Sequence, residues 1–276
     1  MWDMNEETRS RFYGDGPPEL LFGQSFAEYR AIPALNQSTL KAFSDDAWAF
    51  HQREILGNAP PEAETDAMRA GTLIHTAVLE PHLLDEEYAA FDGSDRRTKA
   101  WREFAEEAEA AGKIPTLKKD IDSALRLSDS VRQNATIAAL LEEGHSEVTA
   151  LATCPQTGLR LKGRFDWLTP GGCIVDLKTT ADVDEWAWQR SAKKFRYGVQ
   201  DSFYRELAQL NGIKNPDFVF LVVERNPPYR RRLYSFDHFT TSKESIFFYD
   251  LCYDFDRALK EDLWPDPADQ IKLITL

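Results

Sequence analysis

Three segments of β character follow one another between residues 146 and 180, and this run constrains the fold more than any other part of the sequence. The segments are "SEVTALATC", "LRLKGRFDWL" and "CIVDLKTT", which alternate apolar and polar side chains or carry β-branched residues. Turn signals separate them, "PQTG" in the first interval and "TPGG" in the second. The pattern therefore predicts strands, with a β-hairpin around the Pro-Gly-Gly turn.

The segments on either side of this run are predicted to be mainly helical. Asn36 to Ser38 offer an N-cap for a helix over residues 39–56, and helical patterns also cover residues 66–80, 98–111 and 118–142. After the strands come two helices over residues 184–195 and 197–210, strands in "DFVFLVVER" and "RRRLYSFD", and a helix over residues 242–261. This order predicts an α/β or α+β fold with a mixed central sheet flanked by helices, since a purely parallel sheet would need a crossover after each strand.

The chain is predicted to form one domain of three parts. Residues 1–35 are expected to be an irregular arm, because "GDGPPELLFG" and "RAIPALN" break any long period. Residues 36–142 are expected to be the mainly helical part, and residues 143–276 the part that carries the sheet. The 276 residues can bury a substantial core, and 42% hydrophobic with 29% charged residues is not the composition of a disordered chain.

The overall charge limits the classes of partner. A formal net charge of -13 and a pI near 4.9 argue against a protein that coats nucleic acid or an anionic membrane through its total field. Local basic runs remain at "DRRTK" (95–99), "KKFRY" (193–197) and "RRR" (230–232). They indicate either a basic groove or ordinary solvated surface.

Cysteine content and apolar runs indicate a cytoplasmic protein with no membrane partner. Three widely spaced cysteines without CxxC spacing leave an odd one in any disulfide scheme, which favours a reducing compartment. The N-terminus has no signal-peptide pattern, and the longest strongly apolar run, "FVFLVV", is too short to span a bilayer. No G-x-x-x-x-G-K-[ST] loop occurs, so ATP is not an expected cofactor.

The predicted hairpin brings charged residues together. With Pro170 to Gly172 as its connection, the register pairs Leu168 with Ile174, Asp166 with Asp176, and Arg164 with Lys178. Like charges directly opposite each other destabilise a sheet, so something must offset the repulsion of the two aspartates. One interpretation is a site for Mg2+, a hard cation that takes oxygen ligands, with Lys178 beside it to assist phosphodiester hydrolysis. The alternative is an exposed hairpin in which Arg164 and Lys178 neutralise the aspartates.

At these residues the chain resembles a known family. The D-x9-D-x-K arrangement of Asp166, Asp176 and Lys178 looks like the PD-(D/E)xK nuclease core, which is a restriction-endonuclease-like fold. More closely, the chain resembles the exonuclease VIII (RecE-type) nucleases of phages and prophages. The resemblance runs from about residue 35 to 237 through six ordered segments: "LNQSTLKAF", "GTLIHTAVLEP", "KGRFDW", "VDLKTTADV", "YGVQDSFYRE" and "FLVVERNPPY".

The resemblance implies a set of site residues. The residues implied around the metal are His75, Asp166, Asp176 and the backbone carbonyl of Leu177. Lys178 is implied to assist the attacking water, and Glu147 to be an acidic catalytic residue near the metal. Gln200 and Tyr204, four apart on one helix face, are implied to line the active site and contact substrate, and Arg164 to contact phosphate.

The residues alone leave other interpretations open for several of these positions. His75 lies on a mostly apolar helix, where a single histidine is usually a satisfied core residue. Tyr204 would be an ordinary core residue of an amphipathic helix, and Glu147 a surface glutamate. Arg164 would only balance the aspartates.

The implied activity is a Mg2+-dependent exonuclease, with Mn2+ as an alternative metal, acting on double-stranded DNA ends in a bacterial or phage-infected cell. It would digest 5′ to 3′ and leave 3′ single strands for a single-strand annealing protein in phage-type recombination, and the family forms homo-oligomeric rings. Relatives with an iron-sulfur cluster need four cysteines, so none is expected with three. The alternatives are an endonuclease using the same site, or a catalytically silent DNA-binding or assembly subunit.

Overall fold

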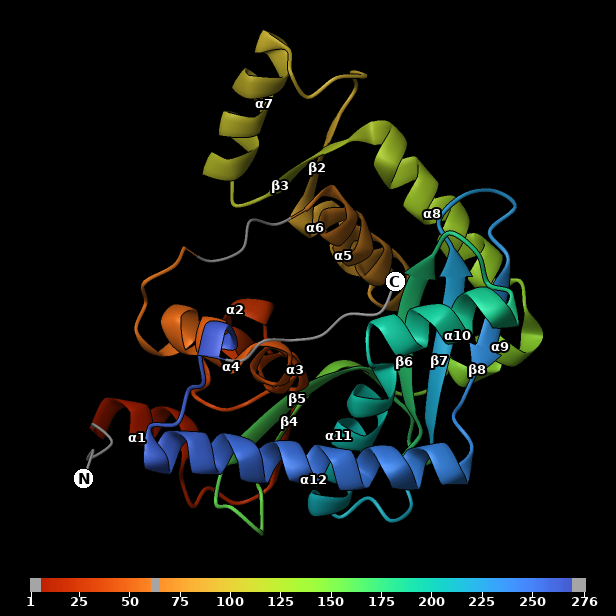
Figure 1. Cartoon of the computed structure of the whole chain (residues 1–276). Coiled ribbons are helices and arrows are strands. Elements are labelled where there is room, and N and C mark those ends of the chain that lie inside the picture. The colour runs from red at the N-terminus through yellow and green to blue at the C-terminus, as the bar shows by residue number, and fades with distance from the viewer. Residues whose placement is uncertain (1–5, 61–64, 270–276) are drawn as a thin grey trace, which may run out of the picture.

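A six-stranded mixed sheet organises the protein in a computed structural model that describes residues 6–60 and 65–269 (Figure 1). The strand order is β1-β4-β5-β6-β7-β8. Their bounds are β1 Glu19–Leu21, β4 His145–Thr153, β5 Arg160–Leu168, β6 Ile174–Thr180, β7 Phe218–Glu224 and β8 Arg231–Tyr234. All neighbours pair antiparallel except β6 and β7, which are parallel and joined through two helices. The predicted mixed sheet flanked by helices is confirmed.

Helices make up most of the remaining described chain. The α-helices are α1 Glu6–Phe12, α2 Phe26–Ala31, α3 Gln37–Asp45, α4 Ala47–Phe50, α5 Asp66–Leu79, α6 Leu84–Glu87, α7 Lys99–Ala110, α8 Lys118–Arg132, α9 Ala135–Leu140, α10 Glu185–Lys194, α11 Tyr197–Leu210 and α12 His238–Glu261. Short π or 3-10 segments are η1 His51–Ile55, η2 Pro81–Leu83 and η3 Pro267–Asp269. Within the described ranges, no helix is long and apolar enough to cross a lipid bilayer.

Side-chain caps start several helices where the sequence predicts them. Asn36 accepts a hydrogen bond from the Thr39 backbone N–H at 2.9 Å and begins α3. Thr98 likewise accepts from the Trp101 N–H at 3.1 Å and begins α7. Each cap satisfies a backbone donor that the first helical turn leaves unpaired.

The prediction of an irregular arm was wrong for residues 6–35, while residues 1–5 lie outside the described chain. This segment contains α1, β1 and α2, and β1 pairs with β4 as an edge strand of the main sheet. Ser25 and Glu28 form a capping box that begins α2. These elements are too short to show a clear period in the sequence. Elements of this length are stabilised mainly by their contacts with the rest of the fold.

Two predicted helices are interrupted. Asp46 ends α3 and caps α4 by accepting from the Ala49 N–H, and Asn134 caps α9 in the same way after α8 has ended.

The sequence prediction also missed a small parallel pair, β2 (Tyr88–Phe91) with β3 (Ile114–Leu117). Its strands are only four residues long, too short for a clear alternation.

The two faces of the main sheet pack against different helices. On one face, β6 residue Ile174 belongs to a hydrophobic cluster with Phe203 of α11 and Phe248 of α12. On the other face, Val175 and Leu177 of β6 join a cluster built largely from α5 and α8. By the period of two, Asp176 and Lys178 therefore point to the α11 side of β6.

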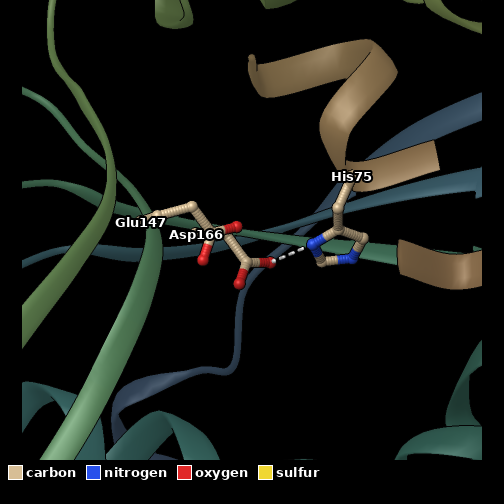
Figure 2. A group of neighbouring side chains, drawn as sticks. All are labelled: His75, Glu147 and Asp166. Atoms are coloured by element: carbon tan, nitrogen blue, oxygen red, sulfur yellow. Dashed lines mark ion pairs between the residues drawn. The ribbon is translucent and has the colours of Figure 1, made fainter. Parts of the chain in front are cut away.

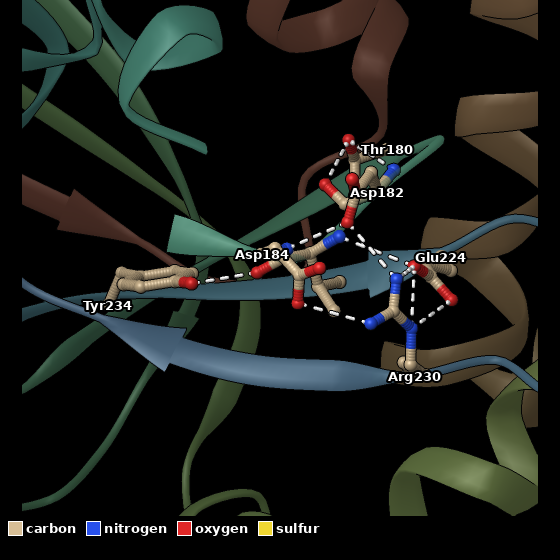
Figure 3. A network of polar contacts seen from close by, with 7 residues as sticks. Thr180, Asp182, Asp184, Glu224, Arg230 and Tyr234 are labelled. Atoms are coloured by element: carbon tan, nitrogen blue, oxygen red, sulfur yellow. Dashed lines mark hydrogen bonds and ion pairs between the residues drawn. The ribbon is translucent and has the colours of Figure 1, made fainter. Parts of the chain in front are cut away.

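An ion-pair network fixes the chain just beyond β6. Arg230 donates to Glu224 at the end of β7, to Asp182 at 3.1 Å and to Asp184 at 3.1 Å (Figure 3). Asp184 is the N-cap residue of α10. The network ties the ends of the parallel strands to the start of the crossover helices, close in sequence to Lys178.

A buried lysine fastens α2 to the sheet. The Lys162 side chain of β5 is 5% exposed, and its ammonium donates to the carbonyls of Tyr29 (3.1 Å), Arg30 (3.2 Å) and Ile32 (2.6 Å). Burial lowers the pKa of Lys162 to about 8. The ammonium thus satisfies carbonyls at the C-terminal end of α2, where a positive charge is also favoured by the helix dipole.

We expect Lys162→Met to lower the free energy of unfolding by about 2–4 kcal/mol, because three buried or partly buried carbonyls lose their charged donor. Urea denaturation at pH 6, where the ammonium is charged, measures the loss. Lys214→Met, at an exposed position, serves as control and should change stability by no more than about 0.5 kcal/mol. Equal stability of the two variants would show that the ammonium does not hold α2.

Candidate active site

The β5–β6 hairpin pairs as predicted only near its turn. Leu168 lies opposite Ile174 and Trp167 opposite Val175, but the ladder ends there. The predicted direct pairing of Asp166 with Asp176, and of Arg164 with Lys178, was therefore wrong. The Asp166 carboxylate instead accepts the backbone N–H of Leu177 at 2.7 Å, and this side chain takes the place of a strand acceptor. The strands can diverge there without leaving this N–H unpaired.

On its other side, Asp166 lies opposite Glu147. Ser146 pairs with Trp167 and Val148 with Phe165, so the register brackets Glu147 and Asp166, which are themselves left out of the ladder. Glu147 has a φ of 51°, in the left-handed region that a residue with a side chain rarely adopts. Such local backbone strain is concentrated at functional sites.

The carboxylates of Glu147 and Asp166 meet the imidazole of His75 (Figure 2). One ligand atom from each residue lies within 4.8 Å of the others, and His75 Nδ1 is 3.6 Å from Asp166 Oδ2. His75 comes from α5, Glu147 from β4 and Asp166 from β5. All three side chains are only partly exposed.

The other ring nitrogen of His75 fixes its tautomer. Nε2 lies 2.9 Å from the backbone carbonyl oxygen of Leu177. A carbonyl only accepts, so Nε2 carries the proton, and in the neutral ring Nδ1 presents a lone pair towards Asp166. Metal-binding histidines commonly donate their second N–H in this way. Leu177 was predicted to bind the metal through this carbonyl; here the oxygen accepts from His75, and a direct bond to metal stays a prediction.

The three residues fit a divalent cation. Burial and, to a smaller extent, the neighbouring Asp166 charge raise the pKa of Glu147 to about 7, while Arg164, which donates to Glu147 at 2.5 Å, opposes the shift. A cation would offset the same repulsion between the two carboxylates. The carboxylates suit Mg2+ or Mn2+, and the imidazole suits transition metals, so the donors accommodate Mn2+ as well as Mg2+.

Asp176, Lys178 and Gln200 form a neighbouring buried group. Asp176 is fully buried, accepts from Gln200 Nε2 at 2.5 Å and forms an ion pair with Lys178. Burial raises the pKa of Asp176 to about 6, against the opposing effect of the Lys178 charge. The Asp166 charge raises this pKa too, so the two aspartates interact, although Asp176 is not one of the three clustered ligands. Its direct bond to metal stays a prediction.

Lys178 stays protonated at neutral pH. Burial on its own would lower the pKa of this ammonium, but the carboxylates of Asp176 and Asp166 outweigh burial and raise it. A lysine in this state orients a water molecule or balances negative charge, and does not act as a base.

Tyr204 and Arg164 both have protein partners in the structure. The buried Tyr204 ring packs edge-on against Phe165 at a centroid distance of 5.2 Å. Gly163 makes room for it, since a Cβ there would lie 3.0 Å from Tyr204 Cε1. Arg164 is bound to Glu147. The substrate contacts predicted for Tyr204, Gln200 and Arg164 stay predictions.

Lys41 of α3 was not singled out in the sequence, although it stands in the quoted segment "LNQSTLKAF". Burial and, to a smaller extent, the Lys178 charge lower the pKa of Lys41 to about 7. The two ammonium groups lie over the same ring, that of Tyr197, at 6.0 Å for Lys41 and 5.1 Å for Lys178. Its position in that motif was the only signal, because a lysine in an amphipathic helix is normally solvated.

The geometry agrees with comparison to known proteins. A family model described as a PDDEXK-like domain of unknown function (DUF3799) matches residues 36–276. The chain belongs to this family. The predicted resemblance of this chain to the PD-(D/E)xK nucleases is thereby confirmed. The closer resemblance to exonuclease VIII is not tested by this match.

A solved structure shares the fold. The chain is similar to a protein from Eubacterium rectale whose crystal structure is described as that of a "putative exonuclease", with a TM-score of 0.65 and 14% sequence identity. The match covers 93% of this chain and 96% of the other. At this identity the likeness shows a shared fold alone. No curated protein matches the chain.

We expect Mn2+ to raise the thermal midpoint of the wild-type protein, because a cation that binds only the folded state stabilises it. His75→Gln and Asp166→Asn should remove most of this rise, as measured by differential scanning calorimetry with and without the metal. Asp254→Asn, on the exposed side of α12, is the matched control and should keep the full rise. A full rise in both site variants would place the metal elsewhere.

Proposed function

We propose that this chain is a metal-dependent nuclease that hydrolyses DNA from duplex ends. The observation that carries the proposal is the meeting of His75, Glu147 and Asp166 beside the Asp176–Lys178 pair, at the point where β5 and β6 diverge. Membership of a PDDEXK-like family supports the same chemistry. Acidic ligands next to a protonated lysine are the groups that metal-assisted phosphodiester hydrolysis needs.

Each residue has a role in this proposal. A bound Mg2+ or Mn2+ would stabilise charge on the phosphate and lower the pKa of a bound water. His75, Glu147 and Asp166 would hold the cation, and the Leu177 backbone orients both His75 and Asp166. Lys178 places its ammonium against the water or the phosphate, and Asp176 fixes that ammonium while Gln200 fixes Asp176.

The choice of exonuclease rests on likeness. The chain resembles exonuclease VIII in six ordered segments, and the structural neighbour carries the description "putative exonuclease". From that resemblance we extend the proposal to 5′ to 3′ digestion, a single-strand annealing partner in phage-type recombination and a homo-oligomeric ring in the cytoplasm. A ring could gather basic segments inward while the acidic surplus behind the net charge of -13 faces outward.

Two alternatives use the same residues differently. An endonuclease would hydrolyse internal bonds, and a silent subunit would bind DNA without cutting it. The silent role is disfavoured because both aspartates, the lysine and the histidine are present and grouped.

Linear and covalently closed duplexes, each incubated with the protein and Mg2+ or Mn2+, separate these activities. We expect loss of the linear DNA only, and release of 5′ end label before 3′ label. Cutting of closed circles would support the endonuclease, and no cutting of either DNA would support the silent role.

The matched variant for this experiment is Lys178→Gln. Digestion of linear DNA should fall by about a hundredfold or more, because the charge beside the phosphate is lost, while the Mn2+ rise in thermal midpoint is retained. A lysine that served only the fold would instead lower the metal-free thermal midpoint and leave the turnover of folded protein unchanged.

A further inference from the structure

An exposed aromatic ring stands one side chain away from the proposed metal site. Phe26 of α2 is 60% exposed, and the Arg164 guanidinium lies 5.6 Å from its ring centroid. The same guanidinium donates to Glu147, which belongs to the proposed metal cluster. The ring therefore covers Arg164 on one side and leaves more than half of its surface to solvent.

The helix that presents this ring is held firmly. Lys162 donates to three carbonyls at its C-terminal end, Ser25 and Glu28 cap its start, and the Tyr29 ring stacks on Phe26 at a centroid distance of 6.2 Å. The Lys162 contacts and the capping box anchor both ends of α2. The fastening holds Phe26 at a fixed place beside the site.

Cations frame the free part of the ring. Arg30 is exposed, and its guanidinium lies 5.9 Å from the Phe26 centroid, on a chain whose overall charge is negative. An exposed aromatic ring between arginines is a combination that binds single-stranded nucleic acid, by base stacking and by phosphate contact. Single exposed phenylalanines are common on protein surfaces and need no functional explanation. Phe26 differs because it contacts Arg164, which in turn binds Glu147 of the proposed metal site.

We propose that Phe26 is a stacking platform for the terminal base of the DNA strand that enters the site, with Arg30 beside its phosphate. The inference rests on the proposed nuclease function. Phe26 lies outside residues 36–276, which the family model matches, so this platform is a feature of the N-terminal segment.

A duplex carrying 2-aminopurine at its 5′ end tests the platform in EDTA, where no DNA is cut. Stacking on an aromatic ring quenches this base, so wild-type protein should quench it. Phe26→Ala should lose the quench and weaken binding of a short single strand by about fivefold or more. Phe26→Trp should keep both, and Trp186→Ala, which removes an even more exposed ring on α10, should behave as wild type.

Three outcomes overturn the platform: full quenching by Phe26→Ala, quenching of free 2-aminopurine nucleotide but not of DNA, or loss of quench with Trp186→Ala instead. Digestion of linear DNA by the wild-type protein is measured in parallel. If it digests and Phe26→Ala still quenches, only the platform fails, whereas no digestion points to failure of the proposed function.

A separate feature lies on α12, which runs along the lower edge of Figure 1. Its buried side packs on α11 and α3, where Phe248 lies against Phe203 and Phe255 against Phe43. Its outer side carries Phe239 (79% exposed), Ile246 (66%) and Tyr253 (50%). These three residues are spaced by seven, so they form one apolar stripe along about four turns of the helix.

The charges beside this stripe select a partner. Lys243 and Asp250 are exposed, also seven apart, and neither forms an ion pair within residues 6–60 and 65–269. If two α12 helices paired parallel and in register, Lys243 would meet the partner's Lys243. If they pair antiparallel about the midpoint between Ile246 and Phe247, Lys243 of each copy faces the partner's Asp250, and Phe239 faces the partner's Asp254, next to Tyr253.

We infer that the outer face of α12 binds a second copy of this chain, antiparallel, about a two-fold axis near Ile246. A two-fold contact of this kind closes on itself and gives a dimer, so a ring would require a different surface as well. The self-complementary charges favour a second copy over an unrelated helix.

Light scattering of the protein as it elutes from a size-exclusion column measures its molar mass and so detects the dimer. Lys243→Asp and Asp250→Lys should each weaken it by about tenfold or more, because both contacts become repulsive. The double variant restores opposite charges and should restore the dimer. Ile246→Cys should form a disulfide-linked dimer on oxidation, whereas Lys214→Cys should not. A monomeric wild type, or a double variant as weak as the single ones, would overturn the inference.

Discussion

The bond from the Leu177 backbone N–H to the Asp166 carboxylate is the interaction on which the site depends. It replaces a strand-to-strand bond with a side-chain bond, and so lets β5 and β6 separate without an unpaired donor. The adjacent carbonyl of Leu177 holds His75. The backbone of Leu177 therefore orients two of the three clustered residues. The neighbouring side chains, Asp176 and Lys178, point to the face of the sheet that α11 covers, opposite to the Leu177 side chain.

This arrangement explains how two groups of opposite character remain close. Glu147 and Asp166 are partly exposed and lie beside an imidazole, whereas Asp176 is fully buried with an amide and an ammonium. The sheet lies between the supports of the two groups, with α5 on one face and α11 on the other. Burial raises the pKa of both Glu147 and Asp176, so a positive charge near either one is favoured.

The strands and the candidate site residues could be predicted from the sequence better than the contacts that those residues make. The turn at Pro170 to Gly172 determined the pairing of Leu168 with Ile174, because hairpin register follows from the turn. It could not show that the ladder ends beside Asp166, because that depends on the Asp166 side chain accepting the Leu177 N–H in place of a strand carbonyl. His75 was found only by resemblance, since a histidine on an apolar helix has no local mark of its role. Phe26 was missed, as its place is set by Lys162, more than 130 residues away in the chain.

The Arg230 network bears on how charge is estimated from sequence. The run "RRR" suggests a positive surface, but Arg230 is shared by Glu224, Asp182 and Asp184, and these three carboxylates offset the charge of the three arginines. Carboxylates that lie elsewhere in the chain thus neutralise a segment that looks basic in isolation. A polyanion approaching the ends of β6 and β7 would therefore meet a much weaker positive field than the run of arginines suggests.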